Sequence, residues 1–373
     1  FAVDKYSGPR EKLKELIDEC HQRGIAVIMD IVLNHAYNPC PFVQMYFDGG
    51  KPATNSPWFN RNHNFTNPDA HWGNDFNHES VYTQQLVDSI NSYWMSEYKF
   101  DGFRFDFTKG FGNNIKGEDD PWGSEYDFDR ITLLKRMSYQ IWQRNPNAIV
   151  IFEHLAENDE EKNLANYGVL MWGNLHFNYG DASMAYNTGG KSDFSWISYQ
   201  ERDWNDPHVV GYMESHDEER IMYKNYNWGN SSDDYDIRDT ATALKRIQLV
   251  NSFFYTIPGP KMIWQFGERG YDYSIDYNGR LGEKPPRWDY MEDWRRSYLF
   301  RHVSALISLK KGHDVFRTED FDLDVGGSMK KITLRHEGMD VVVIGNFRTS
   351  DHTIDPEFTH AGDWYDYFTG NKI

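Results

Sequence analysis

The stretch DGFRFDFTKG, residues 101–110, decides the fold, because it reads as a buried strand that nevertheless carries charges. Successive side chains of a strand point to opposite faces, so its three phenylalanines are expected on one face and Arg104 with Asp106 on the other. A guanidinium beside a carboxylate favours the charged form of both groups, so neither charge is buried without a partner. The pair is therefore either a structural ion pair of the core or part of a functional site.

Strands of this kind alternate with helices along most of the chain. Apolar runs that read as strands lie at 25–35, 101–107, 148–154, 168–172, 208–215 and 260–265. Apolar residues recur at helical spacing at 81–98, 127–144, 237–254 and 291–310. This alternation predicts parallel strands joined by helical crossovers, and the chain length favours a barrel over an open sheet.

The predicted fold is therefore a (β/α)8 TIM-type barrel with a small C-terminal all-β domain. We count six strands and expect the first two barrel strands to be missing from this chain, which begins at Phe1 in what reads as a loop feeding a helix. The catalytic barrel is expected over residues 1–311, with an inserted loop domain at 36–79 after the third barrel strand. From Gly312 the pattern changes to the short alternating runs KKITLRH, DVVVIGNF and WYDYF, which predict a β domain over 312–373.

Composition excludes several classes of function. The net charge of -18 and the lack of basic runs interleaved with aromatic residues argue against nucleic-acid binding. The chain holds two cysteines, Cys20 and Cys40, too few for a disulfide framework or a thiolate metal site. No apolar run reaches membrane-spanning length, so no membrane span is expected. Aromatic residues make up 16% of the chain, and flat rings with polar edges suit sugars as well as ordinary cores.

Polar side chains close several of the predicted strands. In barrels of this kind the chemistry takes place at the carboxyl ends of the strands. The residues at these ends are Asn34, His35, Asp106, Glu153, His216 and Asp217. Three carboxylates from three strands would meet at one mouth. That suits cleavage of a glycosidic bond, in which one carboxylate attacks or stabilises the sugar centre and a carboxylic acid protonates the leaving oxygen.

The surroundings of the acids divide their roles. Asp106 shares a face with Arg104 and is expected to stay ionised, as a nucleophile must. Glu153 follows Ile149 and Ile151 on its own face, so partial desolvation is expected to hold its proton until it acts as the acid. In a retaining reaction the carboxyl groups of Asp106 and Glu153 would lie about 5 to 5.5 Å apart.

Each of these residues also has a plainer interpretation. His35 alone reads as a core histidine with its hydrogen bonds satisfied, and Asn34 as a turn former. Glu153 precedes a helix start at Asn158 that an acidic residue can cap, and Asp217 precedes a charged loop. Their joint placement at strand ends in one series is what favours the functional interpretation.

Four stretches, in this order, resemble the four motifs of the α-amylase superfamily, glycoside hydrolase family thirteen: DIVLNH (30–35), GFRFDFTK (102–109), IFEH (151–154) and ESHD (214–217). GPKMIWQFGE (259–268) also resembles the last barrel strand of that family. The resemblance covers nearly the whole chain. It implies a retaining hydrolase that cleaves internal α-1,4-glucosidic bonds of starch or glycogen through a covalent glycosyl-enzyme. The same motifs serve branching, debranching and transglucosylase enzymes, and a carbohydrate-binding barrel without catalysis is a further alternative.

The resemblance also implies roles for individual residues. Asp106 would be the nucleophile, Glu153 the acid and base, and Asp217 the carboxylate that stabilises the transition state. The residues implied to bind substrate are His35, Arg104, Lys109 and His216. The implied partner is an α-glucan, and a location outside the cell or at its surface is expected because polymeric starch is usually met there.

A structural calcium ion between barrel and inserted loop is implied as well. The matching positions are Asn34, Asp75 and the main-chain oxygen of Gly110, and oxygen ligands from scattered loops suit calcium. Two positions depart from the family pattern. Gly110 stands where many members have histidine, which removes a sugar contact but not a carbonyl ligand, and Ser215 replaces the asparagine usual before the fourth-motif histidine.

Overall fold

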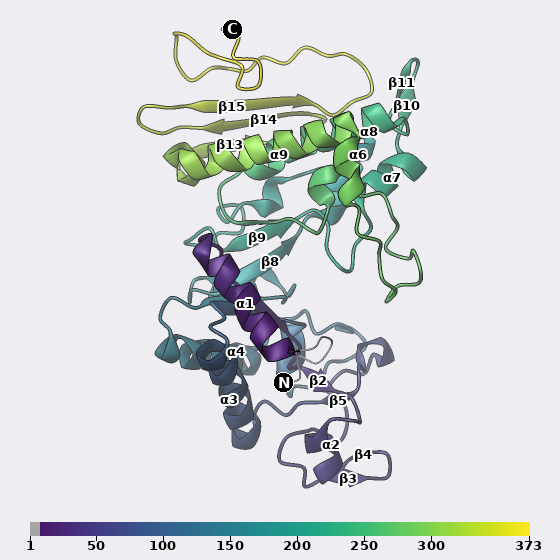
Figure 1. Ribbon diagram of the computed structural model, residues 1–373, viewed down its shortest axis with the longest axis vertical. Helices are drawn as coiled ribbons and strands as arrows, with labels where there is room; N and C mark the ends of the chain where they lie inside the picture. The colour runs from purple at the N-terminus through teal and green to yellow at the C-terminus, as the bar shows by residue number, and fades with distance from the viewer. Residues whose placement is uncertain (1–7) are drawn as a thin grey trace. The chain divides into compact units, whose positions relative to one another are not determined.

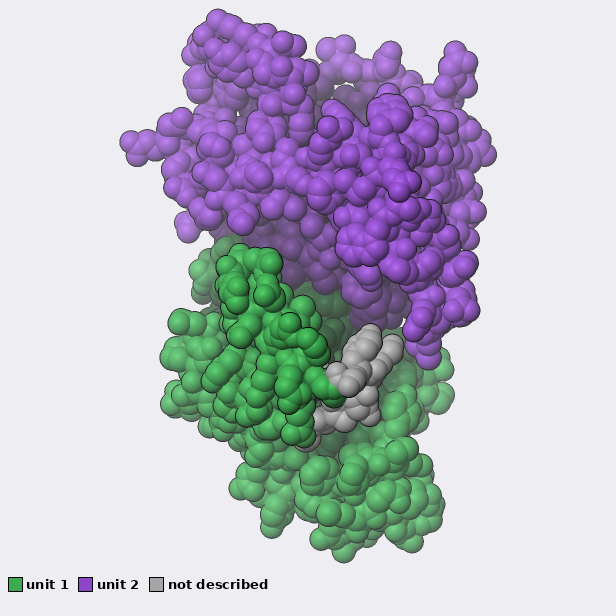
Figure 2. All heavy atoms as spheres, in the orientation of Figure 1, with its two compact units in different colours: residues 1–172, 202–209 green, residues 173–201, 210–373 purple. Residues whose placement is uncertain are grey.

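The computed structural model describes residues 8–373, so the first seven residues of the predicted barrel domain lie outside the described residues. The chain forms two compact units (Figures 1 and 2). The described part of unit 1 is residues 8–172 with 202–209, and unit 2 is residues 173–201 with 210–373. The predicted division at residues 311 and 312 stays a prediction.

Unit 1 is built on parallel strands whose carboxyl ends carry the polar residues singled out above. The strands are β1 (Ile28–Ile31), β6 (Gly102–Phe105), β7 (Ile149–Phe152) and β8 (Leu170–Asn174), which unit 1 holds as far as Trp172. β1 pairs with β6, β6 with β7, and β7 with β8. The register places Phe105 opposite Phe152, so Asp106 and Glu153 are the next residues on neighbouring strands.

Close packing of β6 on β7 depends on one glycine. A Cβ atom at Gly102 would lie 2.0 Å from the carbonyl oxygen of Ile149, a distance that no side chain tolerates. Phe103, Phe105 and Phe152 are fully buried along the same two strands. The absence of a side chain at residue 102 therefore sets how closely these strands approach.

Strand β6 is shorter than predicted. It ends at Phe105, and Phe107 adopts the left-handed region with φ 40°, at the start of the 3-10 helix η2 (Thr108–Phe111). The backbone N–H of Phe107 donates to Glu153 Oε2 at 3.1 Å and that of Thr108 to the Glu153 carbonyl at 3.0 Å. These bonds draw the chain out of the strand, so the prediction that Phe107 shares a strand face with the other two phenylalanines is wrong.

Helices of unit 1 follow the strands in the predicted alternation. They are α1 (Pro9–Gln22), α3 (Val81–Glu97), α4 (Phe128–Arg144) and α5 (Asn158–Ala165). Ser80 and Asp127 cap α3 and α4 by accepting backbone N–H bonds, which polar N-cap residues do in general. α3 and α4 lie side by side, and Arg136 Nη1 of α4 donates to Asp88 Oδ1 of α3 at 3.0 Å (Figure 1).

The loop between β1 and α3 has a small core of its own. It contains β2 (His35–Ala36) paired with β5 (Asn74–Asp75), the hairpin of β3 (Phe47–Asp48) and β4 (Lys51–Pro52), and helix α2 (Pro41–Met45). Val43, Phe59 and Phe76 are buried together inside it. The β2–β5 ladder attaches this loop directly after the end of β1.

Unit 2 combines two parallel strands, helices and a small antiparallel sheet. β9 (Val209–Tyr212) pairs with β12 (Lys261–Met262), and the helices are α6 (His176–Met184), α7 (Ile221–Trp228), α8 (Thr240–Thr256) and α9 (Trp294–Gly312). The sheet consists of β13 (Phe321–Asp324), β14 (Met329–Leu334) and β15 (Val341–Asn346), with β15 against α8.

The antiparallel sheet confirms two of the three predicted C-terminal strands. WYDYF is the exception, because Tyr365 forms only an isolated bridge with Lys372. Across residues 8–373, no helix is both long enough and apolar enough to span a membrane.

Candidate functional site

One guanidinium group organises the strand ends of unit 1. Arg104 is buried on β6, and its Nη1 lies 2.7 Å from Asp30 Oδ1 and 3.0 Å from Asp106 Oδ1. Its Nη2 lies 2.7 Å from Glu153 Oε2. The indole of Trp172 packs against the guanidinium, with its centroid 4.2 Å from the central carbon. Three carboxylates from three strands therefore surround a single cation.

The electrostatics of this group favour its charge. Burial would lower the pKa of Arg104, but the carboxylates of Glu153, Asp30 and Asp106 outweigh it and the net effect raises that pKa. The register explains the third acid, because Asp30 lies directly opposite Arg104 in the β1–β6 pair. Arg104 is thus a permanent cation that fixes the positions of acids on both neighbouring strands.

Asn34 and His35 complete the surroundings of Asp106. Asn34 Nδ2 donates to the Asp106 carbonyl at 3.1 Å and to Oδ2 at 3.2 Å, so the two carboxylate oxygens of Asp106 have different donors. Asn34 Oδ1 lies 2.6 Å from His35 Nδ1. Burial lowers the pKa of His35, with Asp106 opposing, so the ring is neutral and donates from Nδ1 to Asn34.

The Glu153 side chain is only 12% exposed and has polar partners. Its Oε2 accepts from the Phe107 backbone N–H and forms an ion pair with Arg104 Nη2. The expectation of partial desolvation used only the residues on its own strand, whereas both polar partners come from β6 and the turn after it. The position of Glu153 is therefore set by hydrogen bonds to the chain segment that carries Asp106.

Lys109 contacts protein atoms. Its side chain is buried, and Nζ donates to Ser124 Oγ at 3.2 Å and to the Leu155 carbonyl at 3.3 Å. Burial, reinforced by the nearby Arg130, lowers the pKa of this amine. The structure gives Lys109 a role in joining the loops after β6 and β7, and its contact with substrate stays a prediction.

His216 and Asp217 lie together in unit 2, on the segment that follows β9. His216 Nε2 lies 3.3 Å from Asp217 Oδ2, and Arg280 Nη2 lies 3.1 Å from Asp217 Oδ1. The backbone N–H of Asp217 donates to Ser215 Oγ at 3.0 Å, so the serine supports this turn. Both predicted side chains are exposed. The meeting of Asp217 with Asp106 and Glu153 stays a prediction.

The three predicted metal ligands lie close together in unit 1. Asp75 pairs with His35 in the β2–β5 ladder, and the backbone N–H of Phe76 donates to the Asn34 carbonyl at 3.1 Å. A Cβ atom at Gly110 would lie only 3.1 Å from that of Asn34. One backbone carbonyl, one amide and one carboxylate are thus gathered at the base of the inserted loop.

Asp75 is a buried carboxylate held by neutral groups. Its Oδ2 accepts from Asn60 Nδ2 at 2.8 Å and from Asn64 Nδ2 at 2.9 Å. Burial raises its pKa to about 7, and Asn60 only partly opposes this. A hard divalent cation would supply the positive charge that these amides lack, so the donor chemistry fits calcium.

Two residues that contact Arg104 were missed from the sequence. Asp30 lies within the first quoted motif, and Trp172 closes the run at 168–172. A search for polar or aromatic residues at each strand end would have found Trp172. Asp30 needed the β1–β6 register, because its partner lies on another strand.

Comparisons with known proteins agree with the motifs. Residues 1–77 match the family model described as "Alpha amylase, catalytic domain". The 1,4-alpha-glucan-branching enzyme 2-2, chloroplastic/amyloplastic, of Arabidopsis thaliana is 32% identical over 171 residues, which cover 42% of this chain and 20% of that protein. The 1,4-alpha-glucan-branching enzyme of Dictyostelium discoideum is 24% identical over 395 residues, 92% of this chain and 53% of that protein. The matched chain thus spans between about a fifth and a half of these relatives.

Solved structures share the fold. An Anoxybacillus α-amylase superposes with a TM-score of 0.68 at 18% identity, covering 97% of this chain and 74% of that chain. The type I pullulanase of Bacillus subtilis str. 168, complexed with maltose, gives a TM-score of 0.65 at 18% identity, covering 91% and 49%. The predicted fold class is confirmed.

Fold and site together define a (β/α)-barrel protein with acidic side chains at the ends of its strands. In its motifs and in the match of residues 1–77 to the catalytic-domain model, the chain is similar to the α-amylase superfamily, and solved structures of an α-amylase and a cyclomaltodextrinase share the fold.

Proposed function

We propose that this chain carries the catalytic centre of a retaining α-glucan branching enzyme, which opens an α-1,4-glucosidic bond, retains one of the two glucan segments on the enzyme and transfers it to an acceptor chain. The observation that carries the proposal is the placement of Asp106 and Glu153 on adjacent nitrogens of the Arg104 guanidinium. Pairing both carboxyl groups with one guanidinium supports the close arrangement that retention needs. The choice of branching is supported by the relatives named 1,4-alpha-glucan-branching enzymes.

In the first half-reaction, Asp106 attacks the anomeric carbon while Glu153 donates its proton to the leaving glycosidic oxygen. The carbon–oxygen bond breaks, one glucan chain leaves, and the other stays attached to Asp106 as an ester. Because Glu153 Oε2 accepts from the Phe107 N–H and pairs with the Arg104 cation, the proton is carried by the other oxygen, Oε1. Arg104 and Asn34 align the nucleophile by donating to its two carboxylate oxygens.

In the second half-reaction, Glu153 now acts as the base. It removes a proton from the 6-hydroxyl of an acceptor glucose, whose oxygen attacks the anomeric carbon, breaks its bond to the Asp106 oxygen and releases the Asp106 carboxylate. Two inversions give retention and a new α-1,6 bond. Water in place of the sugar hydroxyl would give hydrolysis, so branching and hydrolysis differ only in the acceptor.

The remaining predicted residues bind the substrate in this proposal. The neutral His35 ring and the exposed His216 can exchange hydrogen bonds with glucose hydroxyls, and Asp217 can accept from them as the transition state forms. Lys109 acts on the leaving side through the loop that it joins. A location outside the cell is part of the proposal only because the substrate is a large polymer that is usually met there.

A structural calcium ion is part of the same proposal. Asn34, Asp75 and Gly110 would hold it through oxygen atoms, and the ion would supply charge that fixes the base of the inserted loop beside Asp106. It takes no part in the bond-breaking steps.

Product analysis tests the proposal. Amylose or maltoheptaose is incubated with the protein, and α-1,6 linkages are quantified by proton NMR, with Asp106→Asn as the inactive control. New α-1,6 linkages support branching, whereas short linear sugars alone would replace it with the hydrolase alternative. No change in substrate, with sugar binding retained, would favour a non-catalytic barrel.

A further inference from the structure

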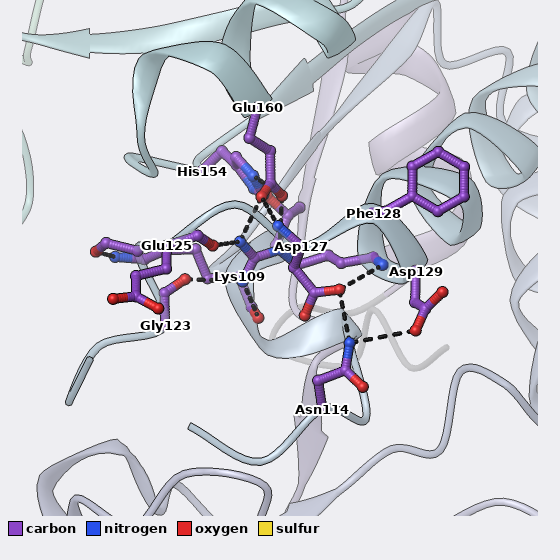
Figure 3. Close-up of polar contacts among 12 residues, drawn as sticks. Lys109, Asn114, Gly123, Glu125, Asp127, Phe128, Asp129, His154 and Glu160 are labelled. Carbon is purple, nitrogen blue, oxygen red and sulfur yellow. Dashed lines mark hydrogen bonds and ion pairs between the residues drawn. The ribbon is translucent and has the colours of Figure 1, made fainter. Parts of the chain in front are cut away.

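A buried cluster of charged side chains lies beside the turns that follow β6 and β7 (Figure 3). The cluster consists of Glu160 on α5, Arg130 on α4 and His154, and all three are essentially inaccessible to solvent. Glu160 Oε1 accepts from Arg130 Nε at 2.7 Å and lies 2.8 Å from His154 Nε2. Its Oε2 accepts from Arg130 Nη2 at 2.8 Å and from the Asp127 N–H at 2.7 Å. Four donors thus saturate one carboxylate.

The protonation of the cluster fixes the orientation of His154. Burial would raise the pKa of Glu160, but His154 and Arg130 outweigh it and lower that pKa to about 2, so Glu160 is an anion. Burial lowers the pKa of His154 to about 4, so the ring is neutral. A neutral ring beside an anion must donate from Nε2, which leaves Nδ1 to accept from the Thr108 hydroxyl at 2.8 Å.

This chain of bonds joins the two segments that carry the catalytic acids. Thr108 lies two residues after Asp106, and its backbone N–H donates to the carbonyl of Glu153 at 3.0 Å. His154 follows Glu153 directly. The cluster therefore holds the turn after β6 and the turn after β7 through one histidine ring.

Arg130 holds the same turns from the other side. Its Nη1 donates to the Lys109 carbonyl at 3.2 Å and to the Gly123 carbonyl at 2.8 Å, and Nη2 donates to the Glu125 carbonyl at 3.1 Å (Figure 3). The amine of Lys109 in turn donates to the Leu155 carbonyl at 3.3 Å. The Nε, Nη1 and Nη2 groups of Arg130 thus donate to the Glu160 carboxylate and to loop carbonyls. Apolar side chains could not replace these hydrogen bonds.

The turns that are held in this way are strained. Phe107, next to Asp106, has φ 40°, and Leu155, two residues after Glu153, has φ 52°. Left-handed backbone at residues other than glycine persists only where the surroundings enforce it, and it gathers at functional sites. The buried cluster contacts both turns beside these residues, at Thr108 next to Phe107 and at His154 next to Leu155.

We propose that Glu160, Arg130 and His154 are positioning residues that hold Glu153 relative to Asp106, so that loss of the cluster impairs proton donation to the leaving group more than nucleophilic attack. The catalytic part of this inference, the roles of Glu153 and Asp106, rests on the proposed function. Glu153 is the more dependent acid because its neighbour His154 belongs to the cluster, whereas Asp106 keeps its bonds to Arg104 and Asn34.

The test compares two leaving groups. Turnover of an α-glucan needs a proton on the leaving oxygen, whereas a maltooligosaccharide with an activated aryl leaving group needs it far less. Thr108→Val removes the hydroxyl contacts to His154 and to the Glu153 carbonyl, and Thr108→Ser retains both. We expect Thr108→Val to lower kcat on the glucan at least tenfold more than on the aryl substrate, and Thr108→Ser to restore the wild-type ratio.

Glu160→Gln tests the cluster itself, with Asp88→Asn as the matched control. Asp88 also pairs with an arginine of α4, but that pair joins α4 to α3. Glu160→Gln is expected to shift the same kcat ratio in the same direction, and Asp88→Asn to leave it unchanged. An unchanged ratio in Thr108→Val, or an equal shift in Asp88→Asn, would overturn the proposal. If Glu160→Gln does not fold, the two Thr108 variants decide.

A second readout does not depend on activity. Hydrogen exchange of residues 106–111 and 153–157 should be at least tenfold faster in Glu160→Gln than in wild type, with no such change in Asp88→Asn. Unchanged exchange in these segments would overturn the positioning role. A wild-type protein that turns over no glucan would refute the proposed function alone, and the exchange data would still decide whether the cluster holds the turns.

Discussion

Arg104 Nη2 lies 2.7 Å from Glu153 Oε2, while the other terminal nitrogen of the same side chain lies 3.0 Å from Asp106. Arg104, which the sequence predicts to pair with Asp106, therefore pairs with both acids. Removing the two terminal nitrogens of Arg104 should therefore disturb the proposed nucleophile and the proposed proton donor together.

Arg104→Lys tests this shared role. A lysine ammonium keeps the charge but cannot bind two carboxylates on separate nitrogens in a fixed plane. We expect kcat on amylose to fall by about 30- to 1,000-fold, equivalent to roughly 2 to 4 kcal/mol of lost transition-state stabilisation. Steady-state kinetics and a thermal melt check this. A folded Arg104→Lys protein with nearly normal kcat would contradict the role.

Asp106→Ala should abolish covalent catalysis. The expected loss is about 5 kcal/mol or more, several orders of magnitude in turnover. Asp30→Asn is the matched control, because Asp30 binds the same guanidinium at 2.7 Å but its side chain is 65% exposed. The turnover of Asp30→Asn should fall by less than about tenfold, since an exposed ion pair contributes little. Comparable losses in both variants would show that the assignment of the nucleophile is wrong.

The buried Asp75 carboxyl predicts a dependence of stability on pH. Its pKa rises from 3.8 in the unfolded chain to about 7 when folded, so the folded state binds the extra proton between these values. Without a cation, stability should fall as pH rises from about 4 to 7, by roughly 2 to 4 kcal/mol. Melting temperatures in the presence of a chelator, from pH 5 to pH 8, measure this loss.

Asp75→Asn isolates this contribution from that of Glu161, whose pKa burial also raises to about 7. The variant should lose less stability than wild type over the same pH range. Added calcium should raise the melting temperature of wild type more at pH 8 than at pH 5, and should not do so in the variant. A calcium effect of equal size in both proteins would place the ion elsewhere.

Gly102→Ala should disrupt the pairing of β6 with β7. The added methyl group would meet the Ile149 carbonyl at 2.0 Å, so the strands must separate, at a cost of about 2 to 3 kcal/mol. Gly312→Ala is the control, because a Cβ atom there meets nothing within 4 Å. Chemical denaturation compares the two. Equal free energies of unfolding for Gly102→Ala and Gly312→Ala would mean that β6 and β7 accommodate the methyl group without separating.

Much of the strand order follows from residue patterns, and the reason for the failures is physical. Apolar runs locate each of the six parallel strands, and the Arg104–Asp106 pair follows from alternation within one strand. The polar surroundings of Glu153 do not follow, because its partners come from the adjacent strand and its turn. The same limit applies to Asp30, which meets Arg104 only through register.

The left-handed turn at Phe107 was also beyond prediction. Nothing in the sequence FDFTKG favours positive φ at a phenylalanine, and the conformation exists because tertiary hydrogen bonds enforce it. The cluster of Arg130, His154 and Glu160 was missed for a related reason. Arg130 is more than 20 residues away from His154 and Glu160 in the sequence, and each of the three residues alone is typical of a charged surface position.

The β6–β7 register also limits how this chain can be redesigned. Since Phe105 lies opposite Phe152, one residue inserted into either strand would displace one acid by about 3.3 Å and turn it to the opposite face. Changes of chain length are therefore tolerable only beyond the two turns. An engineer who seeks a different acceptor sugar should lengthen or shorten those outer loops and leave both strands untouched.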